Sequence, residues 1–195
     1  MMKQIKKVVV GCLLVNPGAW TNMPAGGFDN FLNQYFVESG TSTGKGIEQA
    51  RKAGFAFIYS IELDSTMVYQ AQNKFRFFNN VYIYHGDSGS ILYDLIKHIN
   101  APITFWLDGH NGTYNPHGEN TPVLRELEQI KQHHIKNHII LIDDMHCIGT
   151  PLFDGITKDM LIAKIKEINP AYEISYIAGG DESEYPDNIM VAQVP

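Results

Sequence analysis

The sequence has little charge, little cysteine and no long apolar run, and each shortage excludes a class of protein. Charged residues are 18% of the total, and 15 Lys and Arg against 21 Asp and Glu leave a net charge of −6. Nucleic acids and anionic membrane surfaces attract basic proteins, so we expect neither as the main partner. Two cysteines, Cys12 and Cys147, cannot form a disulfide scaffold, which favours a reducing compartment and a cytoplasmic location.

The longest apolar run, Val8–Val15, lies near the N-terminus and is far shorter than the ~20 residues that cross a bilayer, so we expect no membrane insertion. Lysines precede the run, as in a secretory signal, but a turn-forming segment, Asn16–Trp20, follows it in place of a cleavage site. A buried strand is the favoured interpretation and a signal is the alternative. We expect one domain over 1–195, with a strand and a lid or helix in 1–34 and the core in 35–195.

Short apolar runs alternate with longer amphipathic segments along the chain. The apolar runs predict strands at Lys7–Val15, Tyr35–Glu38, Phe55–Ile61, Val81–Tyr84, Ile103–Leu107, His138–Ile142, Glu173–Ile177 and Ile189–Val194. The amphipathic segments predict helices at Gly44–Ala53, Ser65–Phe78, Ser88–Ile99, Thr121–Ile135 and Thr157–Ile168. This alternation predicts an α/β, Rossmann-like doubly wound fold with helices on both faces of a mostly parallel seven-stranded sheet. The last two strands, joined by a loop alone, should form an antiparallel hairpin.

Acidic residues follow every central strand of the predicted sheet. They are Glu38, Glu62, Asp87, Asp108, Asp143 and Asp144. Ligands of doubly wound sheets bind beyond the carboxyl ends of the strands, so these acids predict one shared ligand cleft. Acids that only cap helices or lie in solvated turns are the alternative interpretation.

The turn after the first of these strands carries two glycines, Gly40 and Gly44, in a G-x-x-x-G spacing. Lys45 is followed by Gly46 rather than by Ser or Thr, which excludes a P-loop, and the spacing disfavours a dinucleotide fingerprint. The glycines favour a close backbone approach to a ligand. A tight strand-to-helix turn without a ligand explains them equally well.

The next two strand ends offer partners for a nucleoside. Glu62 could accept hydrogen bonds from both hydroxyls of a ribose, and Asp87, with Ser88, could address the amino group of an adenine. A ribose and an adenine without a phosphate-binding loop favour an adenosine ligand with an uncharged linker. S-adenosylmethionine fits this description.

These residues resemble the cofactor-binding motifs of the class I S-adenosylmethionine-dependent methyltransferases. The resemblance extends over Tyr35–Val194 and depends on Val37–Gly44, Ile61–Glu62 and Gly86–Ser88. It implies cofactor contacts at Glu38, Ser39, Gly40, Thr41, Ser42, Thr43, Gly44, Glu62, Leu63, Asp87, Ser88 and Asp108. The catechol-type members have a serine where this chain has Gly46, so other groups must hold the methionine carboxylate here.

The acids after the fourth and fifth strands resemble those of the metal-dependent O-methyltransferases, both the catechol type and the enzymes that methylate sugars of macrolide antibiotics. The resemblance implies that Asp108, Asp143 and Asp144 bind a divalent metal. A metal is also expected chemically, because a hydroxyl is a poor nucleophile at neutral pH and Mg²⁺ or Mn²⁺ lowers its pKa. Carboxylate ligands favour these ions over zinc.

Histidines follow two of the predicted metal ligands. His110 is the favoured general base because it should project into the same cleft as Asp108, and His146 is the second candidate. In the sugar-methylating relatives a histidine just after this aspartate is thought to act as the base. Three further histidines are interpreted as solvated or structural: His133, His134 and His138.

The resemblance therefore implies an O-methyltransferase (EC 2.1.1.-) with S-adenosylmethionine and Mg²⁺ or Mn²⁺ as cofactors. The polar loop Asn111–Asn120 offers Tyr114, His117 and Glu119 to a small-molecule or glycan acceptor, or is a plain turn. Its hydrogen-bonding character favours a sugar hydroxyl of a glycan or glycoside over a catechol, and a place within a longer glycan-processing protein fits this acceptor. A nucleotide-binding oxidoreductase and a non-catalytic Rossmann-like binding domain are the alternatives.

Overall fold

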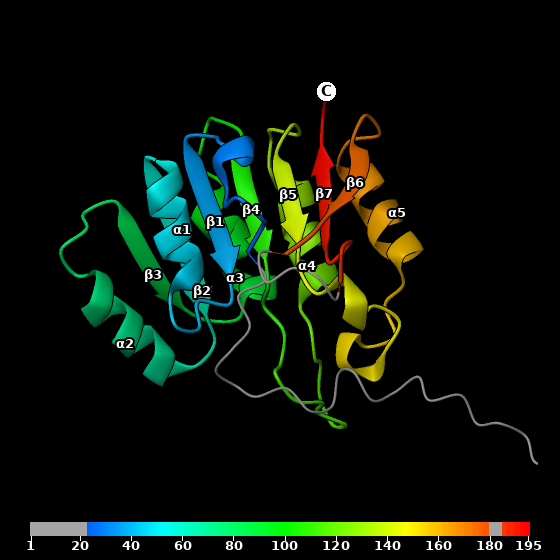
Figure 1. Cartoon of the computed structure of the whole chain (residues 1–195), viewed down its shortest axis with the longest axis horizontal. Helices are drawn as coiled ribbons and strands as arrows, with labels where there is room; N and C mark the ends of the chain where they lie inside the picture. The colour runs from blue at the N-terminus through cyan, green and yellow to red at the C-terminus, as the bar shows by residue number, and fades with distance from the viewer. Residues whose placement is uncertain (1–22, 180–184) are drawn as a thin grey trace, which may run out of the picture.

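The computed structural model describes residues 23–179 and 185–195, and its centre is one seven-stranded sheet (Figure 1). The strands are β1 (Tyr35–Ser39), β2 (Phe57–Glu62), β3 (Val81–His85), β4 (Ile103–Leu107), β5 (Ile139–Ile142), β6 (Glu173–Ile177) and β7 (Ile189–Gln193). Their order across the sheet is β3-β2-β1-β4-β5-β7-β6. Strands β1 to β5 pair in parallel, whereas β7 is antiparallel to both of its neighbours. The predicted mostly parallel sheet and its C-terminal hairpin are confirmed.

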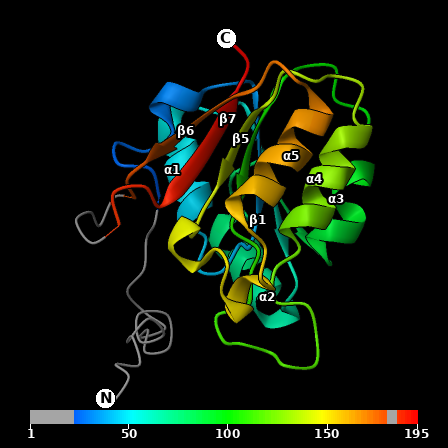
Figure 2. The ribbon, with the colours of Figure 1, turned by 90° about the vertical axis from the view of Figure 1, so that its right-hand side faces the viewer.

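Helices cover both faces of the sheet, as predicted (Figures 1 and 2). They are α1 (Lys45–Ala53), α2 (Ser65–Phe75), α3 (Ser88–Ile96), α4 (Val123–Gln132) and α5 (Lys158–Ile168), with 3-10 turns η1 (Asp29–Phe31), η2 (Met145–Cys147) and η3 (Pro151–Phe153). α1 and α2 pack on one face around Phe36 and Trp106. α3, α4 and α5 pack on the other around Phe105 and Ile140. Among the described residues, no helix is both long and apolar enough to cross a membrane.

Helices α2, α3 and α4 end earlier than their sequence patterns predict, whereas α1 and α5 end at the predicted residues. α2 ends at Phe75 rather than Phe78, and α3 ends at Ile96 rather than Ile99. In both places the later residue donates its amide to the carbonyl three positions before it, so the chain turns out of the helix. The side chains after the turn still pack against the core, which prolongs the apolar pattern beyond the helix. Apolar periodicity therefore overestimates helix length where a buried turn follows.

Part of the predicted N-terminal region lies outside the described residues, including the strand Lys7–Val15 and Cys12. The described remainder of the expected lid contains Phe28, which is fully buried. Its ring lies 4.8 Å from that of Phe36 and 5.5 Å from that of Trp106, centroid to centroid. Phe28 thus belongs to the core on the face that α1 covers.

Candidate functional site

A cleft of about 790 Å³ opens where strands β1 to β4 end. Eight of the predicted site residues line it: Gly40, Ser42, Glu62, Leu63, Asp87, Ser88, Asp108 and His110. The remaining predicted residues do not line the cleft: Glu38, Ser39, Thr41, Thr43, Gly44, Asp143, Asp144 and His146. The structure therefore brings together the ends of β1 to β4, but of the six acids predicted to share the cleft, only Glu62, Asp87 and Asp108 line it.

The turn after β1 is built on a buried acid. The carboxylate of Glu38 accepts a 2.6 Å hydrogen bond from the hydroxyl of Ser60, which lies 2.5 Å from the hydroxyl of Thr41. Burial raises the pKa of Glu38 to about 8, the bond from Ser60 opposes this, and nearby Asp108 and Glu62 add to it. A Cβ at Gly46 would overlap this carboxylate. Packing against Glu38 thus explains why this chain has glycine where the catechol-type motif has serine.

The glycines of this turn bring the backbone close to the cleft. Gly40 has φ +82°, and a Cβ there would lie 2.5 Å from the carbonyl oxygen of Asp108, so only glycine fits between the ends of β1 and β4. Gly44 and Ser42 are also left-handed, with φ of +80° and +46°. The carbonyl of Thr43 accepts a 2.8 Å bond from the ammonium of Lys74, which lies on α2. The turn is therefore fixed from both sides.

The carboxylate of Glu62 is oriented by backbone amides. One oxygen accepts a hydrogen bond from the amide of Ser42 and the other from the amide of Asp64, both at 2.9 Å. Each carboxylate oxygen can accept more than one bond, so the two oxygens retain capacity for hydroxyl donors in the cleft. The same part of the cleft is lined by two apolar side chains, Leu63 and Met67, which are 66% and 37% exposed. A hydrogen-bonding and an apolar surface thus lie next to each other.

Asp87 has more partners than the sequence indicates. Its carboxylate accepts bonds from the amide of Gly89 at 3.1 Å and the hydroxyl of Ser90 at 2.9 Å, which caps α3. It also accepts both terminal nitrogens of Arg125 at 2.8 and 3.0 Å, and this guanidinium also contacts Glu119 of the polar loop. The bonds from Arg125 lower the pKa of Asp87. Asp87 therefore stabilises a helix start and an ion pair at the predicted adenine position.

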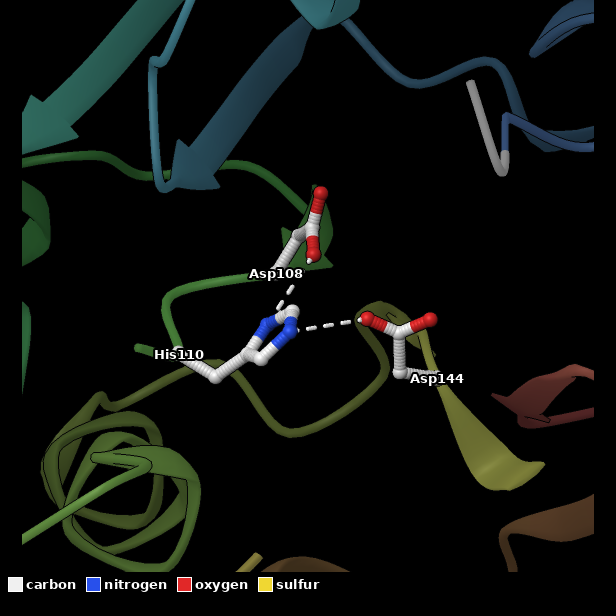
Figure 3. Close-up of side chains that lie close together, drawn as sticks. All are labelled: Asp108, His110 and Asp144. Atoms are coloured by element: carbon white, nitrogen blue, oxygen red, sulfur yellow. Dashed lines mark ion pairs between the residues drawn. The ribbon is translucent and has the colours of Figure 1, made fainter. Parts of the chain in front are cut away.

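The ends of β4 and β5 form a different arrangement, in which the ring of His110 lies between two carboxylates (Figure 3). Its Nε2 is 3.0 Å from Asp144 and its Nδ1 is 3.5 Å from Asp108. Burial lowers the pKa of His110, but the two carboxylates outweigh burial and raise it to about 9. Burial also raises the pKa of Asp108, which His110 partly offsets. We call these three residues the Asp108–His110–Asp144 cluster.

The cluster could hold a metal ion. One ligand atom from each of its three residues lies within 4.8 Å of the others. Ligands about 2.2 Å from one ion are at most about 4.4 Å apart, so small side-chain movements suffice. Among the described residues, this is the one group of three potential ligands with such geometry. Its third member is His110, whereas the sequence predicts Asp143 as the third ligand.

Asp143 supports the turn that carries Asp144. Its buried Oδ1 accepts bonds from the amide of Asp144 at 2.7 Å and from the side-chain nitrogen of Asn188 at 3.0 Å. Asp144 has φ +58°, a left-handed conformation that this bond helps to hold. Asn188 also contacts Nδ1 of His146 at 2.6 Å, and Nε2 of that ring lies 3.2 Å from the sulfur of Cys147. Both ring nitrogens of His146, the second candidate base, thus face protein groups outside the cleft.

The histidines after α4 are structural. His133 and His138 are fully buried at the opposite end of the sheet, 3.1 Å apart between ring nitrogens. Nδ1 of His138 accepts the amide of Ile103, and burial lowers the pKa of His138 to about 3. His134 contacts Asn100 at the surface. The interpretation of these residues as solvated or structural agrees with their positions.

The polar loop after β4 is anchored to the cleft wall. Buried Asn120 bonds to the amide and carbonyl of Asn115 and donates to the carboxylate of Asp154 at 2.8 Å. Of the loop residues offered to an acceptor, Tyr114 is half exposed, and Glu119 lines the cleft while paired to Arg125. The loop is therefore an organised wall of the cleft rather than a plain turn.

Solved structures resemble this arrangement, although no family model and no curated protein sequence matches the chain. The S-adenosylhomocysteine-bound methyltransferase PaMTH1 of Podospora anserina is 13% identical over 83% of this chain and 72% of its own, with a TM-score of 0.54. A methyltransferase of Clostridium acetobutylicum, dependent on S-adenosylmethionine, is 12% identical over 85% and 86%, with a TM-score of 0.54. A candidate caffeoyl-CoA O-methyltransferase of Staphylococcus aureus is 13% identical over 86% and 78%, with a TM-score of 0.55.

The chain has the fold of the class I S-adenosylmethionine-dependent methyltransferases. At sequence identities this low, the similarity to solved structures shows the fold alone. The roles of individual residues are therefore inferred from the geometry of the cleft.

Sequence reasoning missed the roles of four residues that shape the cleft and its surroundings: Arg125, Glu126, Asn120 and Asn188. Glu126 is buried on α4 and accepts a 2.5 Å bond from the hydroxyl of Ser88. Asn188 could have been found, because β7 is antiparallel to β5 and its first residues must lie near the end of β5. The other three come from α4 and the loop before it. No local motif marks them, because each has a partner that is distant in sequence: Asp87 for Arg125, Ser88 for Glu126 and Asp154 for Asn120.

Proposed function

We propose that this chain is an S-adenosylmethionine-dependent methyltransferase that transfers a methyl group to a hydroxyl oxygen. The observation that carries the proposal is one cleft that Gly40 and Glu62 line together with Asp108 and His110. The first pair suits an adenosyl group, and the second pair suits a reacting hydroxyl. The O-methyltransferase-like neighbour agrees with this choice of acceptor atom.

Different residues of the cleft would contact the methionine, ribose and adenine parts of S-adenosylmethionine. The turn from Glu38 to Gly44, with its backbone exposed at Gly40 and Ser42, would lie against the methionine part. Glu62 would accept the ribose hydroxyls on a carboxylate that two amides already orient. Leu63 and Met67 would pack on the adenine, and Ser88 would lie at its edge. Asp87 would act mainly by fixing the start of α3.

The transfer itself exchanges one bond for another. The carbon–sulfur bond of the sulfonium breaks, a carbon–oxygen bond forms, and the acceptor's proton leaves. The products are S-adenosylhomocysteine, a methyl ether and a proton, so no oxidant or reductant is needed. Asp108 lies at the end of β4, where it would orient the acceptor hydroxyl and receive its proton.

A divalent ion, Mg²⁺ or Mn²⁺, would supply Lewis-acid chemistry that lowers the pKa of the acceptor hydroxyl. The donor atoms of Asp108 and Asp144 fit such an ion by distance and by chemical type. Asp143 would hold the turn of Asp144 through its bonds to the amide and to Asn188. The carboxylates would otherwise repel one another in a half-buried site.

The acceptor we propose is a sugar hydroxyl of a glycan or glycoside. No Phe, Tyr or Trp is among the described residues that line the cleft, whereas polar side chains such as Asn111, Glu119 and Asn120 line its acceptor side. Hydrogen-bonding walls suit a polyhydroxyl acceptor better than a catechol, which favours aromatic walls. Among the described residues that line the cleft, Arg125 is the one Arg or Lys. Its guanidinium already pairs with Asp87 and Glu119. This supports an acceptor without phosphates.

Incubation with methyl-labelled S-adenosylmethionine and a panel of acceptors tests the proposal. The panel should contain neutral glycosides, catechols, CoA thioesters and RNA, with mass spectrometry to detect the gain of one methyl group. We expect label on a vicinal-diol glycoside. Label on the catechols alone would change the acceptor, and cofactor binding without transfer to any of them would favour a binding domain.

A further inference from the structure

We infer that His110 is a metal ligand rather than the general base, and that the cluster therefore selects Mn²⁺ over Mg²⁺ and Ca²⁺. This inference rests on the proposed function only in assuming that the acidic end of the cleft binds a divalent ion. It replaces the expected all-carboxylate site of Asp108, Asp143 and Asp144 with a site that contains one nitrogen donor.

The orientation of the imidazole argues against a base in the cleft. A general base needs a ring nitrogen within hydrogen-bond reach of the acceptor hydroxyl. In the structure Nε2 faces Asp144 at 3.0 Å and Nδ1 faces Asp108 at 3.5 Å, so both nitrogens point at carboxylates (Figure 3). The ring also packs 5.5 Å from that of Phe153, centroid to centroid, which restricts its rotation. The same orientation suits a ligand that completes a site with those two acids.

The position of Asp143 supports this exchange of ligands. Asp143 is 2% exposed, and its Oδ1 accepts bonds from the Asp144 amide and from Asn188. It does not belong to the group of donor atoms that lie within 4.8 Å of one another, whereas His110 does. Oδ1 of Asp143 already fixes the turn of the left-handed Asp144 and is not one of the gathered donor atoms. The ring of His110, in contrast, already lies between the two acids.

A nitrogen donor changes which ions the site prefers. Mg²⁺ and Ca²⁺ are hard ions that take oxygen ligands, whereas imidazole binds first-row transition ions well. Mn²⁺ accepts carboxylates and imidazole together, so two carboxylates and one imidazole favour it over Mg²⁺. The contribution of His110 to affinity should then be large for Mn²⁺ and small for Mg²⁺. This difference between two ions distinguishes a ligand from a residue that only shapes the site.

Direct metal binding tests the inference without any measurement of activity. Mn²⁺ binding to the purified chain should be followed by electron paramagnetic resonance, with Mg²⁺ as competitor, for wild type and His110→Ala. We expect His110→Ala to weaken Mn²⁺ binding by about tenfold or more and Mg²⁺ binding by less than about threefold. His98→Ala, at an exposed position, is the matched control and should change neither.

Spin-echo modulation of the bound Mn²⁺ gives a second readout. A directly bound imidazole produces a nitrogen coupling, which we expect in wild type and in His98→Ala but not in His110→Ala. Equal losses of Mn²⁺ and Mg²⁺ affinity, or a nitrogen coupling that persists in His110→Ala, would overturn the assignment of His110. Lack of any Mn²⁺ binding in wild type would also overturn it.

The titration of S-adenosylhomocysteine separates this inference from the proposed function. A chain that binds S-adenosylhomocysteine but has no nitrogen coupling keeps the methyltransferase proposal and loses the metal assignment. A chain that binds Mn²⁺ through nitrogen but does not bind S-adenosylhomocysteine loses the proposed function and keeps the metal site.

Discussion

The two halves of the strand-end edge both carry carboxylates but surround them with different partners. At the ends of β2 and β3, Glu62 accepts two backbone amides, and Asp87 accepts an amide, a hydroxyl and the guanidinium of Arg125. At the ends of β4 and β5, Asp108 and Asp144 face the ring of His110. The first half is a set of oriented hydrogen-bond acceptors, and the second gathers negative charge around one cationic group.

This difference shows that strand-end position alone does not decide what an acid does. Donors from neighbouring turns and helices orient a carboxylate toward a neutral ligand such as a ribose. Carboxylates placed close together favour a cation, because each disfavours ionisation of the other in its absence. The first two predictions below each alter one half and measure both, and the last two alter the residues of α4 that contact the first half.

The largest effect should follow from Asp144→Asn. The amide cannot replace a charged ligand, so we expect Mn²⁺ binding to be lost and methyl transfer to fall more than about a hundredfold. The affinity for S-adenosylhomocysteine should change less than about threefold, because Glu62 and its partners are untouched. Calorimetry and a methyl-transfer assay give the two values, with Asp159→Asn at an exposed site as control. Full activity of Asp144→Asn in chelator would remove the metal from the account.

The converse change is Glu62→Ala. Hydrogen bonds to a charged acceptor are worth about 1.5–3 kcal/mol, so the Kd for S-adenosylhomocysteine should rise about 10- to 100-fold. Mn²⁺ affinity should stay the same, since Glu62 is not part of the metal cluster. Glu173→Ala, an exposed acid on β6, controls for the loss of charge. An unchanged Kd would show that the ribose lies elsewhere.

Glu126→Gln should flatten the pH dependence of stability. Burial raises the pKa of Glu126 to about 7 from its ordinary value of 4.5, while the bond from Ser88 opposes the rise. Because the pKa of Glu126 is higher in the folded chain, the protonated carboxyl contributes its full stability to the fold below pH 4.5. This contribution is lost as the pH rises through 7. The wild type should thus lose on the order of 2 kcal/mol from this group, and the variant should not. Urea unfolding at pH 5 and pH 8 measures this, and equal losses would contradict it.

Arg125→Met should have the smallest effect. The ion pairs of Arg125 with Asp87 and Glu119 are partly exposed, so their loss should reduce the free energy of unfolding by less than about 1 kcal/mol. Asp87 keeps its bonds to Gly89 and Ser90, so the Kd for S-adenosylhomocysteine should change less than about threefold. A tenfold loss of affinity would instead make Arg125 a direct contact of the cofactor.

The sequence predicts most of the fold because its signals are local. Apolar runs mark β1 to β5, and an acid lies at or just after each strand end, so a cleft at the ends of β1 to β4 follows from the parallel arrangement. The antiparallel hairpin of β6 and β7 is likewise predicted from the absence of a helix between them. Helix ends are less accurate, since buried residues such as Ile99 continue the apolar pattern beyond α3.

The detailed roles within the site could not be predicted, because they depend on partners distant in sequence. Asp143 and Asp144 are adjacent residues of the same type. Only the contact of Asp143 with Asn188 identifies Asp143 as the supporting residue and leaves Asp144 as the potential ligand. Arg125 reaches Asp87 from a different helix, which no spacing rule indicates. Gly46 looks like a departure from a motif until the carboxylate of Glu38 is seen to fill that space.

Titration of S-adenosylhomocysteine into the chain by calorimetry tests the central claim most directly, since every assignment assumes that the ends of β1 to β3 bind an adenosyl group. The account predicts one site per chain with micromolar affinity, weakened in Glu62→Ala and retained in Asp144→Asn. Absence of heat with a folded wild-type chain, or binding that is indifferent to Glu62→Ala, would contradict it.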